Sequence, residues 1–176
     1  ETYGTQKLLS FANWPETDPL VNEVSPKLSV ASVTENTEAF IDLENLQLSD
    51  KVESGMFASY NIYPYYPAFL QYGKYTKYID DEGNRNPYRK YLMELVDHHS
   101  CPVIITEYGV PASRSPAYKD VWRNLSQGGN NETEQGIALL EMYEDIQKAG
   151  CAGGLVFTWQ DEWFKRSWNE KNLSNP

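Results

Sequence analysis

The sequence has little positive charge and no cluster of it. Its 176 residues include 15 Lys and Arg against 25 Asp and Glu, which gives a formal net charge of −10 and a pI near 4.6. A nucleic-acid-binding surface needs a basic patch that contacts phosphates, so we expect no nucleic-acid partner. The negative charge is most simply that of a solvated acidic surface.

Long apolar runs and a signal-like segment are also missing from the sequence. No stretch approaches the roughly 20 apolar residues of a membrane-spanning helix, so we expect no membrane segment. The chain opens at Glu1 without the charged and apolar regions of a signal peptide. We therefore expect a piece of a longer protein, and its length suits one domain over residues 1–176.

Cysteine and histidine are scarce, with two of each. Cys101 and Cys151 each precede a predicted strand, and we expect two free thiols rather than a disulfide framework. His98 and His99 are neighbours at the end of a predicted helix, where adjacent side chains point to different faces. We therefore expect no metal site and no cofactor. The Gly-x-Ser-x-Gly motif of acyl-transfer hydrolases is missing as well.

Aromatic residues, by contrast, are plentiful. They make up 14% of the chain, with 13 Tyr and 5 Trp, and they gather in residues 60–78 and 159–168. Tyr and Trp beside polar residues suit a surface that stacks on sugar rings or on a protein partner.

The apolar runs predict an alternation of strands and helices. Strands are expected at residues 8–14, 56–63, 103–107 and 153–159, with loops at 21–38, 64–85 and 112–130. Helices are expected from Pro87 to 98–100 and from about Glu132 to Ala149. A brief extended segment at 40–46 would place Asp42 and Glu44 on one face. This order favours parallel strands joined by crossover helices, an α/β fold.

A carboxylate at the end of the third predicted strand is the central feature of the sequence. The β-branched run Val103–Ile105 is typical of a buried strand, and it leads directly to Glu107, Gly109 and Pro111. Chemistry collects at the carboxyl ends of parallel strands, although a Glu here could equally cap the next helix.

Strand alternation brings further groups to the same edge of the sheet. We expect Glu107 to share a face with Val103 and Ile105, and Asn61 to share one with Tyr63. Trp159 ends the last strand. If these faces all point inward, a phenol, an amide and an indole surround a carboxylate nucleophile.

Three motifs, in order, resemble clan-A retaining glycoside hydrolases, particularly family 2 enzymes such as β-glucuronidases. Ile104–Gly109 (IITEYG) is similar to the nucleophile strand, Asn61–Tyr63 (NIY) to the preceding strand, and Gly154–Trp159 (GLVFTW) to the last strand. The resemblance implies strands 5–8 of a (β/α)8 TIM barrel, the second half of the domain. It also implies Glu107 as nucleophile, Tyr63 as its hydrogen-bond donor, Asn61 near the sugar and Trp159 beneath it.

The family's general acid, a Glu in an Asn-Glu pair, has no equivalent in this sequence. Glu44-Asn45 has the reverse order, Asn22-Glu23 lies in a predicted loop, and Asp161-Glu162 is more typical of a braced loop. A complete barrel takes about 250 residues. We therefore expect half of a catalytic domain, inactive alone, that self-associates or pairs with the missing half-barrel.

An alternative function is a non-catalytic module that binds carbohydrate without cleaving it. Its contacts would come from four aromatic residues, Trp14, Tyr65, Trp159 and Trp163. An Asn-Glu pair after a strand upstream of residue 1 would favour the enzyme over this module.

Overall fold

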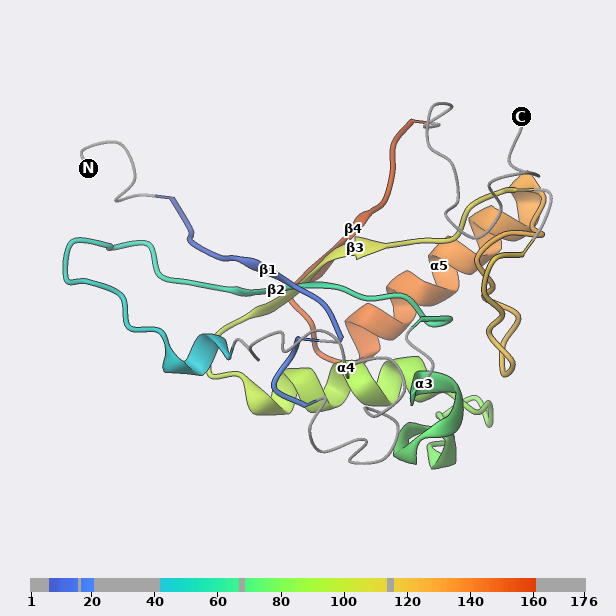
Figure 1. Cartoon of the computed structure of the whole chain (residues 1–176), viewed down its shortest axis with the longest axis horizontal. Helices are drawn as coiled ribbons and strands as arrows, with labels where there is room; N and C mark the ends of the chain where they lie inside the picture. Colours follow the sequence, from blue (N-terminus) through green and yellow to red (C-terminus); the bar gives the residue numbers. More distant parts are fainter. Residues whose placement is uncertain (1–6, 16, 21–41, 67–68, 114–115, 161–176) are drawn as a thin grey trace, which may run out of the picture.

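A computed structural model gives the fold of the chain (Figure 1). It describes residues 7–15, 17–20, 42–66, 69–113 and 116–160. The loop predicted at 21–38 lies outside these residues. None of the described helices is long and apolar enough to cross a membrane.

Four parallel strands form one sheet in the order β1-β2-β3-β4, so neighbours along the chain are neighbours in space. The strands are β1 (Ala12–Asn13), β2 (Ala58–Asn61), β3 (Val103–Tyr108) and β4 (Gly153–Val156). Pairing continues beyond the short β1, because Leu9 forms a bridge with Met56. The predicted α/β fold with parallel strands and interleaved helices is confirmed.

The two long helices begin and end where the sequence predicts. In α4 (Pro87–His98), the N-cap Asn86 accepts a hydrogen bond from the Arg89 amide at 3.0 Å, and proline occupies the first helical position. In α5 (Glu132–Lys148), Asn131 and Glu134 form a reciprocal capping box. Gly150 follows the end of α5 with φ +88°, the left-handed geometry that glycine adopts without strain.

Two segments predicted as loop or strand instead form short helices. Residues 64–85 contain α3 (Phe69–Tyr72) and a 3-10 helix at Lys74–Lys77. The buried Tyr75 packs edge-on against Tyr91 of α4, with ring centroids 5.3 Å apart, and this contact holds the turn against the core. A second 3-10 helix, Leu43–Asn45, replaces the extended segment expected at 40–46.

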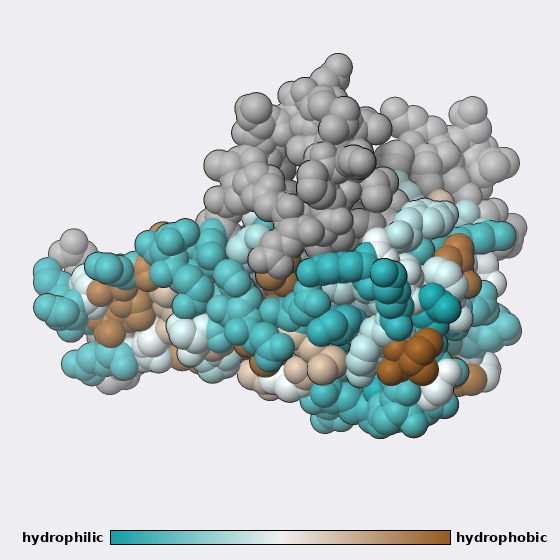
Figure 2. Space-filling view, turned by 90° about the horizontal axis from the view of Figure 1, so that it is seen from below, coloured by the Kyte–Doolittle hydropathy of each residue, from teal (hydrophilic) through white to brown (hydrophobic). Residues whose placement is uncertain are grey.

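Helices α4 and α5 cover one face of the sheet (Figure 1). The core between them and the strands includes Tyr60, Leu92, Ile105 and Met142, all buried. A Cβ on Gly154 would lie 2.9 Å from the side-chain ends of both Ile146 and Tyr108, so these two side chains pack directly on the backbone of β4. Figure 2, seen from the side where α3 and α4 lie, shows a mostly hydrophilic surface with separate hydrophobic patches.

Candidate active site

A bulge in β3 sets the direction of the Glu107 side chain. Along β2, Tyr60 pairs with Ile105 but Asn61 pairs with Glu107, so Thr106 is an extra residue in β3. The pairing with β4 shows the same irregularity, between Ile105 and Tyr108. Two consecutive side chains, those of Thr106 and Glu107, therefore both point to the face of the sheet opposite α4 and α5.

The predicted face assignment for β3 is therefore wrong in one respect. Val103 and Ile105 are buried on the face that α4 and α5 cover, whereas Glu107 lies on the face of Asn61. Strict alternation would put Glu107 with Val103 and Ile105, and the bulge reverses this. Glu107 still lies beside Asn61 and Tyr63, as expected, but for a different reason.

Tyr63 and Glu107 form the predicted hydrogen bond. The Tyr63 hydroxyl donates to Glu107 Oε2 at 2.9 Å, from the segment after β2 to the end of β3. Both side chains are half-buried. A phenol in this position restricts the rotamers of the carboxylate and stabilises its charge.

Tyr65 packs against the ring of Tyr63. Its ring stacks on that of Tyr63, with centroids 5.3 Å apart, and its hydroxyl donates to the carbonyl of Gly109 at 3.4 Å. Burial, and next the charge of Glu107, raise the pKa of the Tyr65 hydroxyl. We expected Tyr65 to be a sugar-binding surface residue, but its side chain is only 5% exposed and it packs beneath the site.

Gly109 allows the close approach of β4 to the exit of β3. A Cβ at this position would lie 2.7 Å from the carbonyl oxygen of Phe157, and φ is +153°. The Phe157 amide donates to the Tyr108 carbonyl at 2.9 Å just beside it. A residue with a side chain would push the last strand away from Glu107.

A chain of short side chains lines the same face next to Glu107. The Thr106 hydroxyl donates to Asn61 Oδ1 at 2.9 Å, and the Ser59 hydroxyl lies 2.7 Å from Thr106 Oγ1. With Thr106 as donor to Asn61, Ser59 donates to Thr106. The amide nitrogen of Asn61 is then the group that can face a ligand hydroxyl.

The tryptophans predicted to bind sugar differ in how exposed they are. Trp159 follows β4 and is 93% exposed, so little protein covers its ring. Trp14 follows β1 and is 45% exposed. Trp163 lies outside the described residues. The indoles at the ends of β1 and β4 are thus open to a ligand, but neither packs into the core beside Glu107.

Glu44 is too far from Glu107 to serve as the second carboxylate. It accepts hydrogen bonds from the Ser100 amide at 3.0 Å and the Ser100 hydroxyl at 2.6 Å, before β3 begins. Seven residues separate Ser100 from Glu107, about 23 Å along a strand. Retaining hydrolysis needs the carboxyl groups about 5–5.5 Å apart. Asn22-Glu23 and Asp161-Glu162 lie outside the described residues.

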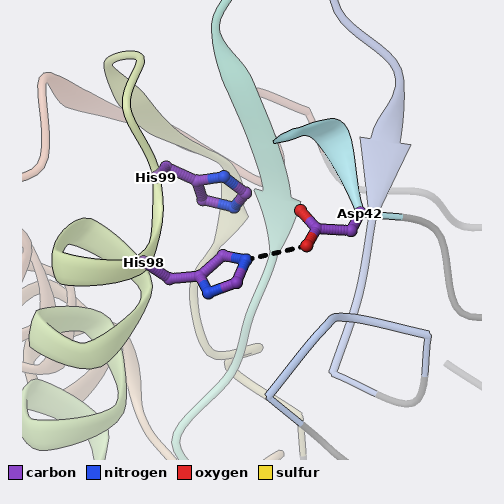
Figure 3. Close-up of side chains that lie close together, drawn as sticks. All are labelled: Asp42, His98 and His99. Carbon is purple, nitrogen blue, oxygen red and sulfur yellow. Dashed lines mark hydrogen bonds and ion pairs between the residues drawn. The ribbon is translucent and has the colours of Figure 1, made fainter. Parts of the chain in front are cut away.

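His98 and His99 do lie together, contrary to the expectation from helical geometry (Figure 3). His99 caps α4 with extended backbone (φ −89°, ψ 138°), so its side chain leaves the helical phase. The ring centroids of His98 and His99 are 5.0 Å apart, and His98 Nε2 lies 3.0 Å from Asp42 Oδ2.

Comparisons with protein-family models, with curated proteins and with solved structures find no match to this chain. The fold and the arrangement around Glu107 therefore carry the functional argument.

Proposed function

We propose that this chain is the C-terminal half of the catalytic domain of a retaining glycoside hydrolase, with Glu107 as the nucleophile. The observation that carries the proposal is the hydrogen bond from Tyr63 to Glu107, at the carboxyl end of a parallel sheet. An oriented carboxylate at this place is the group that attacks the anomeric carbon of a sugar. The four strands would be strands 5–8 of a (β/α)8 barrel.

The reaction proceeds by two displacements at the anomeric carbon. A Glu107 oxygen forms a bond to that carbon while the bond to the leaving oxygen breaks, which gives a glycosyl ester. Tyr63 holds the carboxylate toward the sugar, and Asn61 binds a hydroxyl. A general acid on the other half of the barrel protonates the leaving group and then deprotonates the attacking water.

A carbohydrate-binding module without catalysis is the second candidate. The exposed indoles of Trp14 and Trp159 favour it, because an uncovered indole stacks on a sugar face without further chemistry. Such a module would bind oligosaccharides equally well with Glu107 replaced by Gln.

A panel of aryl glycosides tests the half-domain proposal. The isolated chain should hydrolyse none of them at an enzymatic rate, because the acid and half of the barrel are missing. Turnover at about 1 s⁻¹ or more that Glu107→Gln abolishes would contradict the need for a second half. Tight oligosaccharide binding that is unchanged in Glu107→Gln would favour the binding module.

A further inference from the structure

Both histidines of the protein face carboxylates of the same short segment. The chain has two His, and His98 Nε2 lies 3.0 Å from Asp42 Oδ2 while His99 Nδ1 lies 3.1 Å from Glu44 Oε1. Figure 3 shows the first of these pairs, with the His98 and His99 side chains directed toward Asp42. Segments more than 50 residues apart in sequence thus bring two imidazoles and two carboxylates together.

The backbone on both sides of the cluster is held in place. Asp42 is the N-cap of the 3-10 helix Leu43–Asn45 and accepts from the Glu44 amide at 3.0 Å. Glu44 is tied to Ser100 by two hydrogen bonds. His99 is 8% exposed. The backbone that carries the ligand side chains is therefore ordered before any ion arrives, which lowers the cost of forming a site.

We propose that Asp42, His98 and His99 bind a divalent transition-metal ion, with Zn²⁺ as the best fit. Each residue offers a ligand atom, and these atoms lie within 4.8 Å of one another. Zn²⁺ bonds of about 2.0–2.2 Å in tetrahedral geometry hold ligand atoms roughly 3.3–3.5 Å apart, so the side chains close by about an ångström. Two imidazole nitrogens and a carboxylate oxygen suit Zn²⁺, and water completes the set.

Glu44 prepares His99 for this role. A carboxylate only accepts, so the His99 Nδ1 atom facing it carries the ring proton, and the lone pair is on Nε2. A carboxylate on one imidazole nitrogen with the metal on the other is the usual outer-shell arrangement of zinc sites. The Tyr60 hydroxyl, 2.7 Å from Nε2, donates to this lone pair and therefore competes with the metal.

A rival donor set shares His99. Ligand atoms of Glu44, His99 and Cys101 also lie within 4.8 Å of one another. Binding there would remove Glu44 from its orienting position and would require the thiol to lose its proton. The set with Asp42 and His98 leaves Glu44 on His99 Nδ1 and needs no thiolate. It asks only that the His98 ring proton, which faces Asp42 from Nε2, move to Nδ1 of the same ring as the metal binds, and we favour it for this reason.

The site is independent of the proposed glycosidase chemistry. His98 and His99 precede β3, and Glu107 is near its opposite end, so an ion here would hold the segment at 42–45 against α4 rather than act on a substrate. Removing the metal should lower thermal stability and leave any chemistry at Glu107 in place.

The test uses the untagged full chain, treated with a chelator and titrated with ZnCl₂. We expect one ion per chain with a micromolar or tighter Kd, and a Tm that rises with the zinc concentration. Because the chain has two imidazoles, the side-chain ¹⁵N resonances of both should shift. His98→Gln and Asp42→Asn should each weaken binding by about tenfold or more.

Two variants serve as comparisons. Tyr60→Phe removes the competitor for His99 Nε2 and should tighten binding, while Cys151→Ser, away from the cluster, should bind as the parent does. Absence of binding at millimolar Zn²⁺ would overturn the proposal, as would an affinity unchanged in His98→Gln. With Co²⁺ in place of zinc, an intense thiolate charge-transfer band in the near ultraviolet would instead assign the ion to Cys101.

Discussion

Among single residues, one carboxylate and the side chains that orient it are central to the proposed chemistry. Tyr63 contributes the hydrogen bond, and the buried Tyr65 stacks behind it. Asn61 is occupied on its oxygen by Thr106, which leaves its amide nitrogen for a ligand. The hydrogen bond from Tyr63 holds the Glu107 side chain in one direction, and Tyr65 also belongs to the hydrophobic core.

Tyr63→Phe tests the orienting role of the phenol. A hydrogen bond to a charged group is worth about 1.5–3 kcal/mol, so formation of the glycosyl ester should slow by about 10- to 100-fold while the melting temperature changes little. The rate of ester formation is measured as the pre-steady-state release of the aryl group, in a protein that also carries the half of the barrel with the general acid. Tyr72→Phe, at a tyrosine that is 71% exposed, is the matched control and should have no effect.

The two cysteines give a second prediction at this scale. Burial raises the pKa of the Cys151 thiol to about 12 and also raises that of Cys101, so both should react slowly with iodoacetamide at pH 8. Both are free thiols, as expected from the sequence. In denaturant without reductant both should become labelled, and a count of zero by mass spectrometry would contradict the free thiols.

At the scale of elements, a buried ionic network joins α4 to α5. Asp145 of α5 has no exposed surface and accepts from Arg89 Nε and Asn86 Nδ2, each at 2.8 Å, and from Arg123. Asn86 also caps α4 and donates to Asp80 at 3.1 Å. These hydrogen bonds hold the first turn of α4 against the last turn of α5.

Asp145→Ala should destabilise the fold strongly. It removes the buried carboxylate to which Arg89 and Arg123 both donate, while Arg89 keeps its ion pairs with the carboxylates of residues 80–82. Breaking a buried ion pair costs about 3–5 kcal/mol, and because these pairs remain we expect a loss of about 3 kcal/mol. Denaturant unfolding measures the loss. Glu144→Ala, at the exposed neighbouring position of the same helix, should change the free energy of unfolding by less than about 0.5 kcal/mol.

The same network predicts a loss of stability in acid. Burial raises the pKa of Asp80, but hydrogen bonds from Asn84 and Asn86 and the charge of Arg89 lower it more, so the net pKa is below the usual value. A depressed carboxyl pKa contributes stability above the unfolded value near 3.9, and this is lost as the pH falls through the folded pKa. In Asp80→Asn, the dependence of unfolding free energy on pH below about 4 should become shallower.

At the scale of the whole molecule, the described sheet has two open edges and one face without helices. On that face β4 presents Leu155 and Phe157, which are 57% and 37% exposed. Parallel sheets are normally covered on both faces, and unpaired edge strands recruit other strands. Half of a barrel would have this shape.

We therefore expect the isolated chain to self-associate or, if the proposed function is right, to bind a chain that supplies the other half of a barrel. Sedimentation velocity should show a mass that increases with concentration. Leu155→Lys, on the open face, should reduce association without unfolding the chain. A monomer at high concentration with a cooperative melt would argue that the fold closes in another way.

The sequence predicted the elements with local signals and missed those set by packing. Asn86-Pro87 and Gly150 marked helix ends because capping is a short-range property. The bulge at Thr106 was missed because nothing in the sequence of this strand marks one of its residues as extra. The pairing of His98 and His99 with Asp42 was missed because the capping residue leaves the helical phase, which a continuous helix pattern does not show.

The role of Glu107 as nucleophile is tested by identifying the carboxylate that becomes glycosylated. The protein for this test is the one that also carries the proposed other half of the barrel. In 2-deoxy-2-fluoro glycosides the fluorine slows both displacements at the anomeric carbon, and an activated leaving group restores only the first, so the ester accumulates. Peptide mass spectrometry, over a panel of sugars, should locate one glycosyl ester at Glu107, and Glu107→Gln should not be labelled. An ester on another carboxylate, or no ester with any sugar in the panel, would contradict Glu107 as the nucleophile.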